Sequence, residues 1–251
     1  MTSITISFFL TIFAGLSTLL GCIPMYLKNT NNKLLIGSLA FASGVMLTVS
    51  ILDLIPESFI MINSSYYSIP SIIIVIIFIL LGYYFSSFFD KFLIMKEEKI
   101  IDKKLYKTGM ISLIAIILHN IPEGIITFLT SSYDLSLGIS LTLAIILHNI
   151  PEGISISIPI YYSTQSRKKA FLYTSISALS EPFGALISYC FLSRFINNFI
   201  LGILFSFIAG LMINISLMEL LPTSFSYKQK ESTLTYFLLG IITMLISLIF
   251  I

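Results

Sequence analysis

The sequence predicts an all-α polytopic membrane protein with eight transmembrane helices, and three observations support this prediction. Hydrophobic residues make up 57% of the chain and charged residues only 10%, with a mean hydropathy of +1.00. Apolar runs of about twenty residues, long enough to cross the hydrocarbon core, recur along the whole chain. Most lysines and arginines lie between these runs. A soluble helical core is disfavoured, because soluble proteins do not repeat apolar runs of this length.

The apolar runs occupy nearly all of the 251 residues and leave almost no chain for a soluble domain. We therefore expect a single transmembrane domain over residues 1–251. The predicted helices cover residues 4–27, 34–60, 68–93, 109–131, 136–161, 170–194, 198–222 and 233–251.

The distribution of lysine and arginine predicts the orientation of these helices. Basic residues follow the first, third, fifth and seventh spans, so thirteen of the fourteen lie on one side and only Arg194 on the other. The positive-inside rule makes that side cytoplasmic and leaves both termini outside. Topology thus accounts for the basic residues, and no nucleic-acid partner is expected. They are Lys28, Lys33, the lysines from Lys91 to Lys107, Arg167 to Lys169, Lys228 and Lys230.

The first three spans are recognised by their apolar length and by their flanks. The first has its basic residues after it, as a helix with an external N-terminus requires. The second carries Asp53, Pro56 and Glu57 near its outer end, and the third leads into residues 94–108, which lack histidine. We expect Asp53 and Glu57 to attract cations at the outer mouth of a pathway. Interfacial carboxylates at a helix end are the alternative.

The fourth and fifth spans each contain the sequence Ala-Ile-Ile-Leu-His-Asn-Ile-Pro-Glu-Gly-Ile, at 115–125 and again at 144–154. The two copies hold the only histidines of the chain. Within each copy the histidine and the glutamate are four residues apart, so both serve one helix face together with the asparagine. The candidate metal ligands are His119, Asn120, Glu123, His148, Asn149 and Glu152.

The two copies should lie at similar depth, near the midplane of the bilayer. Each histidine is about fourteen residues, hence about 20 Å of helix, from the loop centred near residue 133. Because the helices are antiparallel, Glu123 should lie outward of the histidines and Glu152 inward. Such a ladder has room for two ions, so we expect a binuclear site, with a mononuclear site as the alternative.

Prolines accompany the ligands. Pro122 and Pro151 cannot donate to the carbonyls of Leu118 and Leu147, and we expect a kink beside each ligand set. Irregular backbone inside a membrane is tolerated where it lines a cavity. Ordinary proline kinks with a few hydrogen-bonded polar groups are the alternative.

The sixth and seventh spans add two acidic residues. Glu181 lies midway along the sixth span, at matching depth, and is the expected third carboxylate of the site. A protonated Glu181, or one hydrogen-bonded to serine, is the alternative. Glu219 lies near the inner end of the seventh span, where we expect the inner mouth of the pathway or, alternatively, an interfacial carboxylate. The eighth span is apolar.

The charge balance inside the membrane indicates a bound cation. Six acidic residues lie within the spans, with no lysine or arginine deep enough to pair with them. Each costs at least about 2.5–3.5 kcal/mol to insert. Imidazole, carboxylate and amide ligands without thiolate suit Zn²⁺, Fe²⁺, Mn²⁺, Co²⁺ or Cd²⁺ and disfavour Cu⁺, Mg²⁺ and Ca²⁺. Cys22 and Cys190 form no CxxC motif and are expected to pack as apolar residues.

These motifs resemble those of the ZIP (Zrt/Irt-like) family of divalent metal transporters, and within it the bacterial ZupT-type zinc transporters. The resemblance runs over nearly the whole chain. It rests on Gly44-Val-Met, Asp-Leu-Ile-Pro-Glu at 53–57, the two His-Asn-Ile-Pro-Glu-Gly motifs, Leu-Ser-Glu-Pro-Phe-Gly at 179–184 and Glu-Leu-Leu-Pro at 219–222.

The resemblance implies uptake of a divalent transition metal, zinc first, across the bacterial plasma membrane by rigid-body movement of one helix group against another. It also suggests a homodimer, and no cofactor besides the transported metal. Many family members have Asp where this chain has Asn149, and a histidine-rich loop where it has residues 94–108. The implied central site comprises His119, Asn120, Glu123, His148, Asn149, Glu152 and Glu181.

Two other functions compete with uptake. A metal exporter could use the same ligands, although eight spans without a soluble metal-binding tail disfavour the six-span exporters. An intramembrane zinc hydrolase would also need His and Glu in helices, but it should keep an open catalytic position beside a small ligand set. A structural metal site is a third, weaker alternative, because amide ligands suit metal release better than permanent binding.

Overall fold

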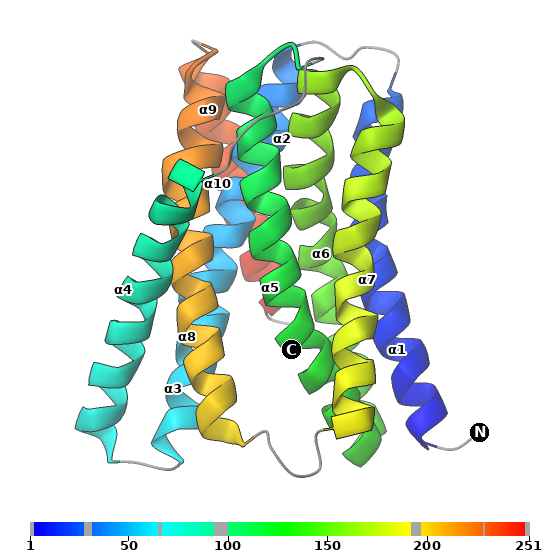
Figure 1. Cartoon of the computed structure of the whole chain (residues 1–251), viewed down its shortest axis with the longest axis vertical. Coiled ribbons are helices and arrows are strands. Elements are labelled where there is room, and N and C mark those ends of the chain that lie inside the picture. The colour runs from blue at the N-terminus through cyan, green and yellow to red at the C-terminus, as the bar shows by residue number, and fades with distance from the viewer. Residues whose placement is uncertain are drawn as a thin grey trace.

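The computed structural model describes residues 3–27, 32–64, 67–92, 100–191, 197–227 and 229–248. Within these ranges the secondary structure is entirely helical, and the helices form eight rods that alternate in direction along the chain (Figure 1). Their segments are α1 (Ser3–Ser17) with η1 (Thr18–Tyr26), α2 (Asn32–Val49) with η2 (Ser50–Leu54) and α3 (Ile55–Asn63), α4 (Ser68–Phe92), α5 (Lys103–Tyr133), α6 (Leu135–Thr164), α7 (Arg167–Phe191), α8 (Asn198–Asn214) with η3 (Ile215–Leu220) and α9 (Leu221–Phe225), and α10 (Lys230–Leu248).

The eight rods correspond to the eight predicted spans, and the predicted fold class is confirmed. In the described residues seven rods are long and apolar enough to cross a membrane. The exception is α7, whose sequence includes four serines, Thr174 and Glu181. The predicted ends at residues 93, 192–194 and 249–251 lie outside the described residues.

Helix α5 begins six residues earlier than predicted because of a cap. The side chain of Asp102 accepts a hydrogen bond from the backbone nitrogen of Leu105 at 3.0 Å, which satisfies one free donor of the first turn. Asp134 caps α6 in the same way through Ser136 and Leu137, and it is the only residue between α5 and α6. The tight connection places the two copies of the repeated motif on adjacent antiparallel helices.

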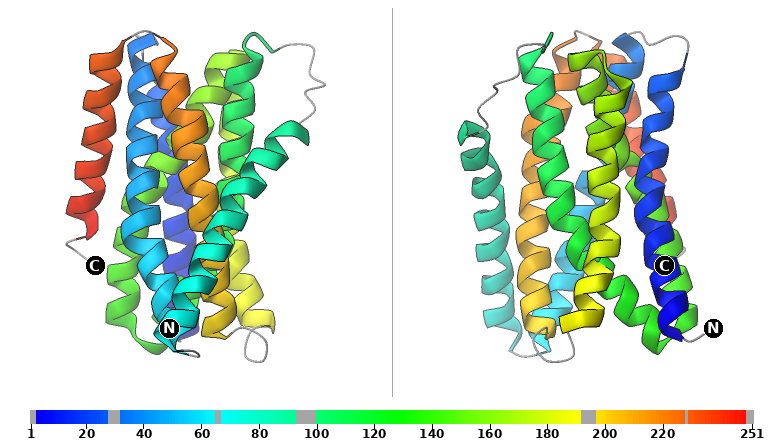
Figure 2. Two further views of the ribbon diagram at one scale, coloured as in Figure 1. Left: turned by 90° about the vertical axis from the view of Figure 1, so that its left-hand side faces the viewer. Right: turned by 45° about the vertical axis from the view of Figure 1, so that its right-hand side comes forward.

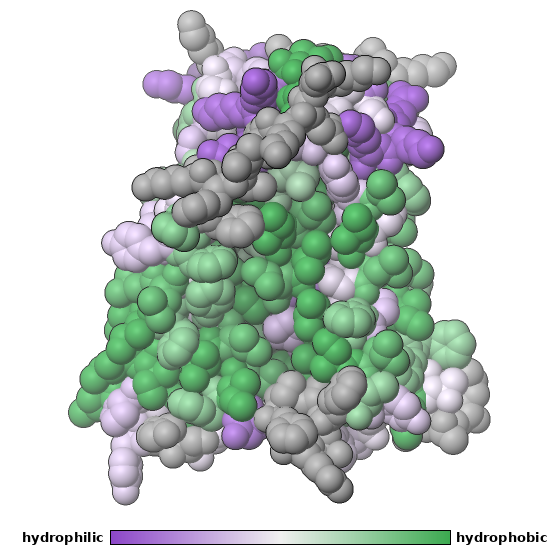
Figure 3. Space-filling model, viewed as in Figure 1, coloured by the Kyte–Doolittle hydropathy of each residue, from purple (hydrophilic) through white to green (hydrophobic). Residues whose placement is uncertain are grey.

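Polarity is distributed along the rods as a membrane protein requires. The surface in view has a hydrophobic band, with hydrophilic residues gathered at one end (Figure 3). The N-terminus lies at the other end, and α10 runs toward that end as well (Figure 1). Four of the predicted cytoplasmic basic residues lie outside the described residues: Lys28, Lys96, Lys99 and Lys228. Arg194, which is predicted on the opposite side, also lies outside them. The orientation of the molecule in the cell stays a prediction.

The rods pack as two groups of four. One group contains α1, α5, α6 and α7, and the other contains the α2–α3 rod, α4, the α8–α9 rod and α10. Glycines bring backbones together within each group, since a Cβ at these positions would collide with the backbone of the neighbouring helix. The glycines are Gly21 and Gly153 between η1 and α6, Gly124 and Gly184 between α5 and α7, Gly44 and Gly240 between α2 and α10, and Gly82 and Gly210 between α4 and α8.

The motifs Asp-Leu-Ile-Pro at 53–56 and Glu-Leu-Leu-Pro at 219–222 lie in corresponding turns of two rods, as expected for an inverted repeat. Asp53 lies in the π-helical turn η2 and Glu219 in the π-helical turn η3, and each turn ends just before a proline. Proline cannot donate to the carbonyl four residues earlier, so the helix widens to an i+5 turn there. Each turn packs against the rod that holds the other. Ser43 and Ser216 join these rods, with hydroxyl oxygens 2.8 Å apart. The sequence pattern hints at the repeat but not at the π turns.

Candidate metal site

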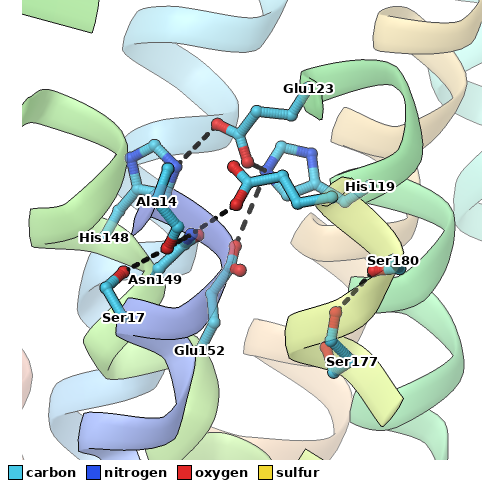
Figure 4. Close-up of polar contacts among 10 residues, drawn as sticks. Ala14, Ser17, His119, Glu123, His148, Asn149, Glu152, Ser177 and Ser180 are labelled. Atoms are coloured by element: carbon cyan, nitrogen blue, oxygen red, sulfur yellow. Dashed lines mark hydrogen bonds and ion pairs between the residues drawn. The ribbon is translucent and has the colours of Figure 1, made fainter. Parts of the chain in front are cut away.

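Four ionisable side chains of the repeated motif meet between α5 and α6, and they point toward one another (Figure 4). Oε1 of Glu123 lies 2.8 Å from Nε2 of His148. Nε2 of His119 lies 3.6 Å from Oε2 of Glu123 and 3.6 Å from Oε1 of Glu152. Ligand atoms of His119, Glu123 and His148 all lie within 4.8 Å of one another, and all three residues are buried. Glu123 therefore bridges the histidines of both helices.

A second layer of polar groups lies beside this cluster, where α6 faces α1 and α7. Nδ2 of Asn149 donates to the backbone oxygen of Ala14 at 3.0 Å and to Oε2 of Glu181 at 3.3 Å. The hydroxyl of Ser180 donates to the backbone oxygen of Ser177 instead. Glu181 is thus held by Asn149 rather than by its neighbouring serine, and it is fully buried.

Many polar atoms of these two layers, and those of Asn120 next to His119 on α5, are buried without a hydrogen-bond partner. A buried polar group with no partner costs about 1–3 kcal/mol, so such groups are rarely gathered in one place unless something binds them. Imidazole nitrogens and carboxylate and amide oxygens are ligands for divalent metals. The atoms are Nδ1 and Nε2 of His119, Nδ2 and Oδ1 of Asn120, Oε2 of Glu123, Nδ1 of His148, Oδ1 of Asn149, both carboxylate oxygens of Glu152 and Oε1 of Glu181.

A cavity of about 240 Å³ joins the acidic pair of the second rod to the cluster. Asp53 and Glu57 line it together with His119 and Glu123. Helices of both groups therefore contribute to its wall. The cavity thus brings carboxylates of the α2–α3 rod and a histidine and a glutamate of α5 to one space.

Glu219 is not among the residues that line this cavity. It lies in η3, directly before α9, and α9 lies at the end of the molecule where hydrophilic residues gather (Figures 1 and 3). Its Oε2 accepts a hydrogen bond from the hydroxyl of Thr108 at 3.3 Å. Thr108 belongs to α5 and Glu219 to the α8–α9 rod, so this bond links the two helix groups. Of the three residues predicted at the ends of the pathway, Asp53 and Glu57 line the cavity that reaches the cluster. Glu219 instead takes part in a contact between the two helix groups.

Comparison with known proteins identifies the family. A family model described as ZIP Zinc transporter matches residues 95–248. The Zinc transporter ZupT of Clostridium perfringens is 38% identical to this chain, with 99% of this chain and 97% of that protein covered. The proteins of the same name from Streptococcus mutans and Chlorobium chlorochromatii are each 37% identical, with 97% and 98% of this chain covered and 96% and 98% of those proteins. The chain belongs to the ZIP family.

Membership of the ZIP family confirms the resemblance seen in the motifs, including its ZupT type, and confirms a multi-pass membrane protein. The matched proteins are named transporters, so the zinc hydrolase alternative is wrong.

The glycine of each ZIP motif has a clear local role in this chain. Gly124 follows Glu123, and a Cβ there would collide with the backbone of Glu181. Gly153 follows Glu152, and a Cβ there would collide with the backbone of Thr18 in η1. Each glycine thus lets a neighbouring helix approach at the level of the repeated motif, and Gly124 lets the backbone of Glu181 lie close to α5.

Sequence reasoning missed two groups around this ZIP site. Thr127 lines the cavity, and its hydroxyl is buried without a partner. It lies one turn beyond Glu123, so extending the His119–Glu123 face by four residues would have found it. The backbone oxygen of Ala14, which accepts from Asn149, carries no signal in the sequence because every residue has such an oxygen.

Proposed function

We propose that this ZIP-family chain takes up divalent transition-metal ions, zinc first and iron, manganese, cobalt and cadmium as further candidates, across the plasma membrane into the cytosol. The observation that carries the proposal is the buried cluster of His119, Glu123 and His148 with its unpaired ligand atoms. The names of the relatives support zinc as the substrate.

The proposed pathway starts at the cavity with Asp53 and Glu57, whose charges attract the hydrated ion. The ion then exchanges water for the nitrogen and oxygen atoms of the cluster. Bonds of about 2.0–2.2 Å to zinc place neighbouring tetrahedral ligand atoms about 3.4 Å apart, close to the 3.6 Å from His119 Nε2 to Glu123 Oε2. Small shifts of the side chains therefore suffice for binding. On the inner side, Glu219 would receive the ion.

Release requires that binding not be too strong. Asn120 and Asn149 offer neutral amide oxygens, which hold a metal more weakly than carboxylates do.

A membrane potential of 100 mV, negative inside, favours inward movement of a doubly charged ion by about 4.6 kcal/mol, at about 2.3 kcal/mol per charge. The division into two helix groups supports a movement of one group against the other, during which the Thr108–Glu219 bond would break.

We further propose that two ions bind, one at His119, Glu123 and His148 and one at Glu152, Asn149 and Glu181. Purified protein saturated with Zn²⁺ is expected to retain two ions per chain, measured by mass spectrometry of the metal after gel filtration. Glu181→Gln is expected to retain one, because the second ion loses one of its two carboxylate ligands, whereas the exposed Glu231→Gln control retains two. One ion per wild-type chain would establish the mononuclear alternative.

The direction of transport is tested in cells. A bacterium deficient in zinc uptake that expresses this chain is expected to accumulate ⁶⁵Zn²⁺ faster than the same strain expressing Glu123→Gln at equal protein level. An exporter would produce the opposite result, with less zinc retained by cells that carry the wild-type chain. Equal accumulation in both strains would contradict a transport role for the cluster.

A further inference from the structure

A groove of about 380 Å³ runs along the surface where α10 packs on α2, at some distance from the metal cluster. Figure 2 shows these two helices side by side at the edge of the molecule. The residues that shape the groove are Lys33, Gly37, Phe41, Ile154, Tyr236 and Leu239. Gly37 makes room for it, since a Cβ there would lie 3.1 Å from the ring of Tyr236.

The two ends of the groove differ in polarity. Lys33 lies at one end, in the first turn of α2, and its side chain is exposed. Phe41, eight residues further along α2, lies about 12 Å deeper. From there the wall is mostly apolar, with Leu239 on the opposite side, and the hydroxyl of Thr243 in this wall donates to the backbone oxygen of Leu239. A ligand that fits this shape has an anionic end and a hydrocarbon end.

The first turn of α2 strengthens the case for an anion. It contains Lys33 and no acidic residue. The free N–H groups of a helix N-terminus carry a partial positive charge, which disfavours a lysine there and favours an anion. Lys33 is therefore placed against the helix dipole. A phosphate at this position would compensate both charges.

We propose that this groove binds an anionic phospholipid, with its phosphate at Lys33 and one acyl chain between α2 and α10. Lys33 matches the charge of a lipid headgroup, and the wall between α2 and α10 matches an acyl chain. These two matches favour a lipid over a protein partner. Ile154 of α6 also lines the groove, so the acyl chain would touch the group that contains α6 as well as the group that contains α2 and α10. Binding itself does not depend on the proposed transport function.

The chain contains no tryptophan, which allows a direct test. Leu239→Trp places one fluorophore in the groove, and Leu238→Trp places one beside it on the exposed surface of the same helix. Each variant is reconstituted in mixtures that contain brominated phosphatidylglycerol or brominated phosphatidylcholine with identical chains. Quenching of the tryptophan by the bromines then reports which lipid occupies the position.

We expect the tryptophan at position 239 to show about a fivefold preference for phosphatidylglycerol over phosphatidylcholine. Lys33→Ala should reduce this ratio to that of the Leu238→Trp control, and Lys33→Arg should keep it. A ratio at position 239 equal to the control, or one unchanged by Lys33→Ala, would overturn the proposal. So would weak quenching by both lipids, because a second copy of the chain or another surface would then cover the groove.

Discussion

The Glu123→Gln variant is expected to carry ⁶⁵Zn²⁺ into proteoliposomes at less than about one hundredth of the wild-type rate. Loss of a residue that only hydrogen-bonds to a metal ligand already lowers metal affinity or activity about 10–100-fold. Glu123 is proposed to be a ligand itself, so its loss should cost more. Its two oxygens lie 2.8 Å from His148 and 3.6 Å from His119. Glutamine keeps the size of the side chain but removes the charge that holds the ion between both histidines. Initial rates of influx at equal protein density provide the measurement.

Two further variants make this result specific. His148→Ala should lose a similar fraction of the flux, and the double variant should be little worse than either single one, because residues that act as one unit are not additive. Glu231→Gln, an exposed glutamate in the first turn of α10, should transport as the wild type does. Wild-type flux in Glu123→Gln and His148→Ala would mean that the repeated motif is structural.

The Gly124→Ala variant is expected to weaken both the fold and the metal site. Its new methyl group would collide with the backbone of Glu181, so α5 and α7 must separate. Overpacking costs about 1–3 kcal/mol, which corresponds to roughly 2–12 °C in Tm for a chain of this size. Displacement of α7 also shifts Glu181 relative to the ligands on α5 and to Asn149 on α6, so zinc affinity should fall about 10–100-fold. Thermal unfolding and zinc titration in lipid nanodiscs measure the two effects.

Gly37→Ala is the matched control for this prediction. Its Cβ would meet only the edge of the Tyr236 ring, which can move, and alanine favours the helix by about 1 kcal/mol. Its Tm should therefore equal or exceed that of the wild type. Equal stability of Gly124→Ala and Gly37→Ala would contradict close backbone packing of α5 on α7.

The repeated motif shows why one part of the site could be predicted from the sequence. His119 and Glu123 are four residues apart, and helix geometry alone brings them to one face. Their counterparts at 148 and 152 repeat this spacing. The contact that unites the copies, between Glu123 and His148, could not be predicted in detail. It depends on how closely α5 and α6 approach and on their relative rotation.

The acidic residues of the other spans show the same division. The cost of burying a carboxylate without a basic partner predicted that Asp53, Glu181 and Glu219 have special environments. Only the packing of the rods assigns these environments: Asp53 lines the cavity, Glu181 pairs with Asn149, and Glu219 joins Thr108. The π turns that hold Asp53 and Glu219 could not be predicted, because a proline after an acid permits a kink, a helix end or a widened turn.

The sequence by itself determined the class of the protein, its eight helices, its membership of the ZIP family and the residue types of its site. The class and the helices follow from apolar length and charge distribution, and the shared helix face of the site follows from helix periodicity, all of which are local properties of the chain. The family follows from the likeness of its motifs to those of known proteins. The tertiary structure decided which helices form each group, which carboxylates share the cavity and where Asn149 is held. Those contacts join residues far apart in the chain, 135 positions for Asn149 and Ala14 and 173 for Ser43 and Ser216, and only the packing of whole helices specifies them.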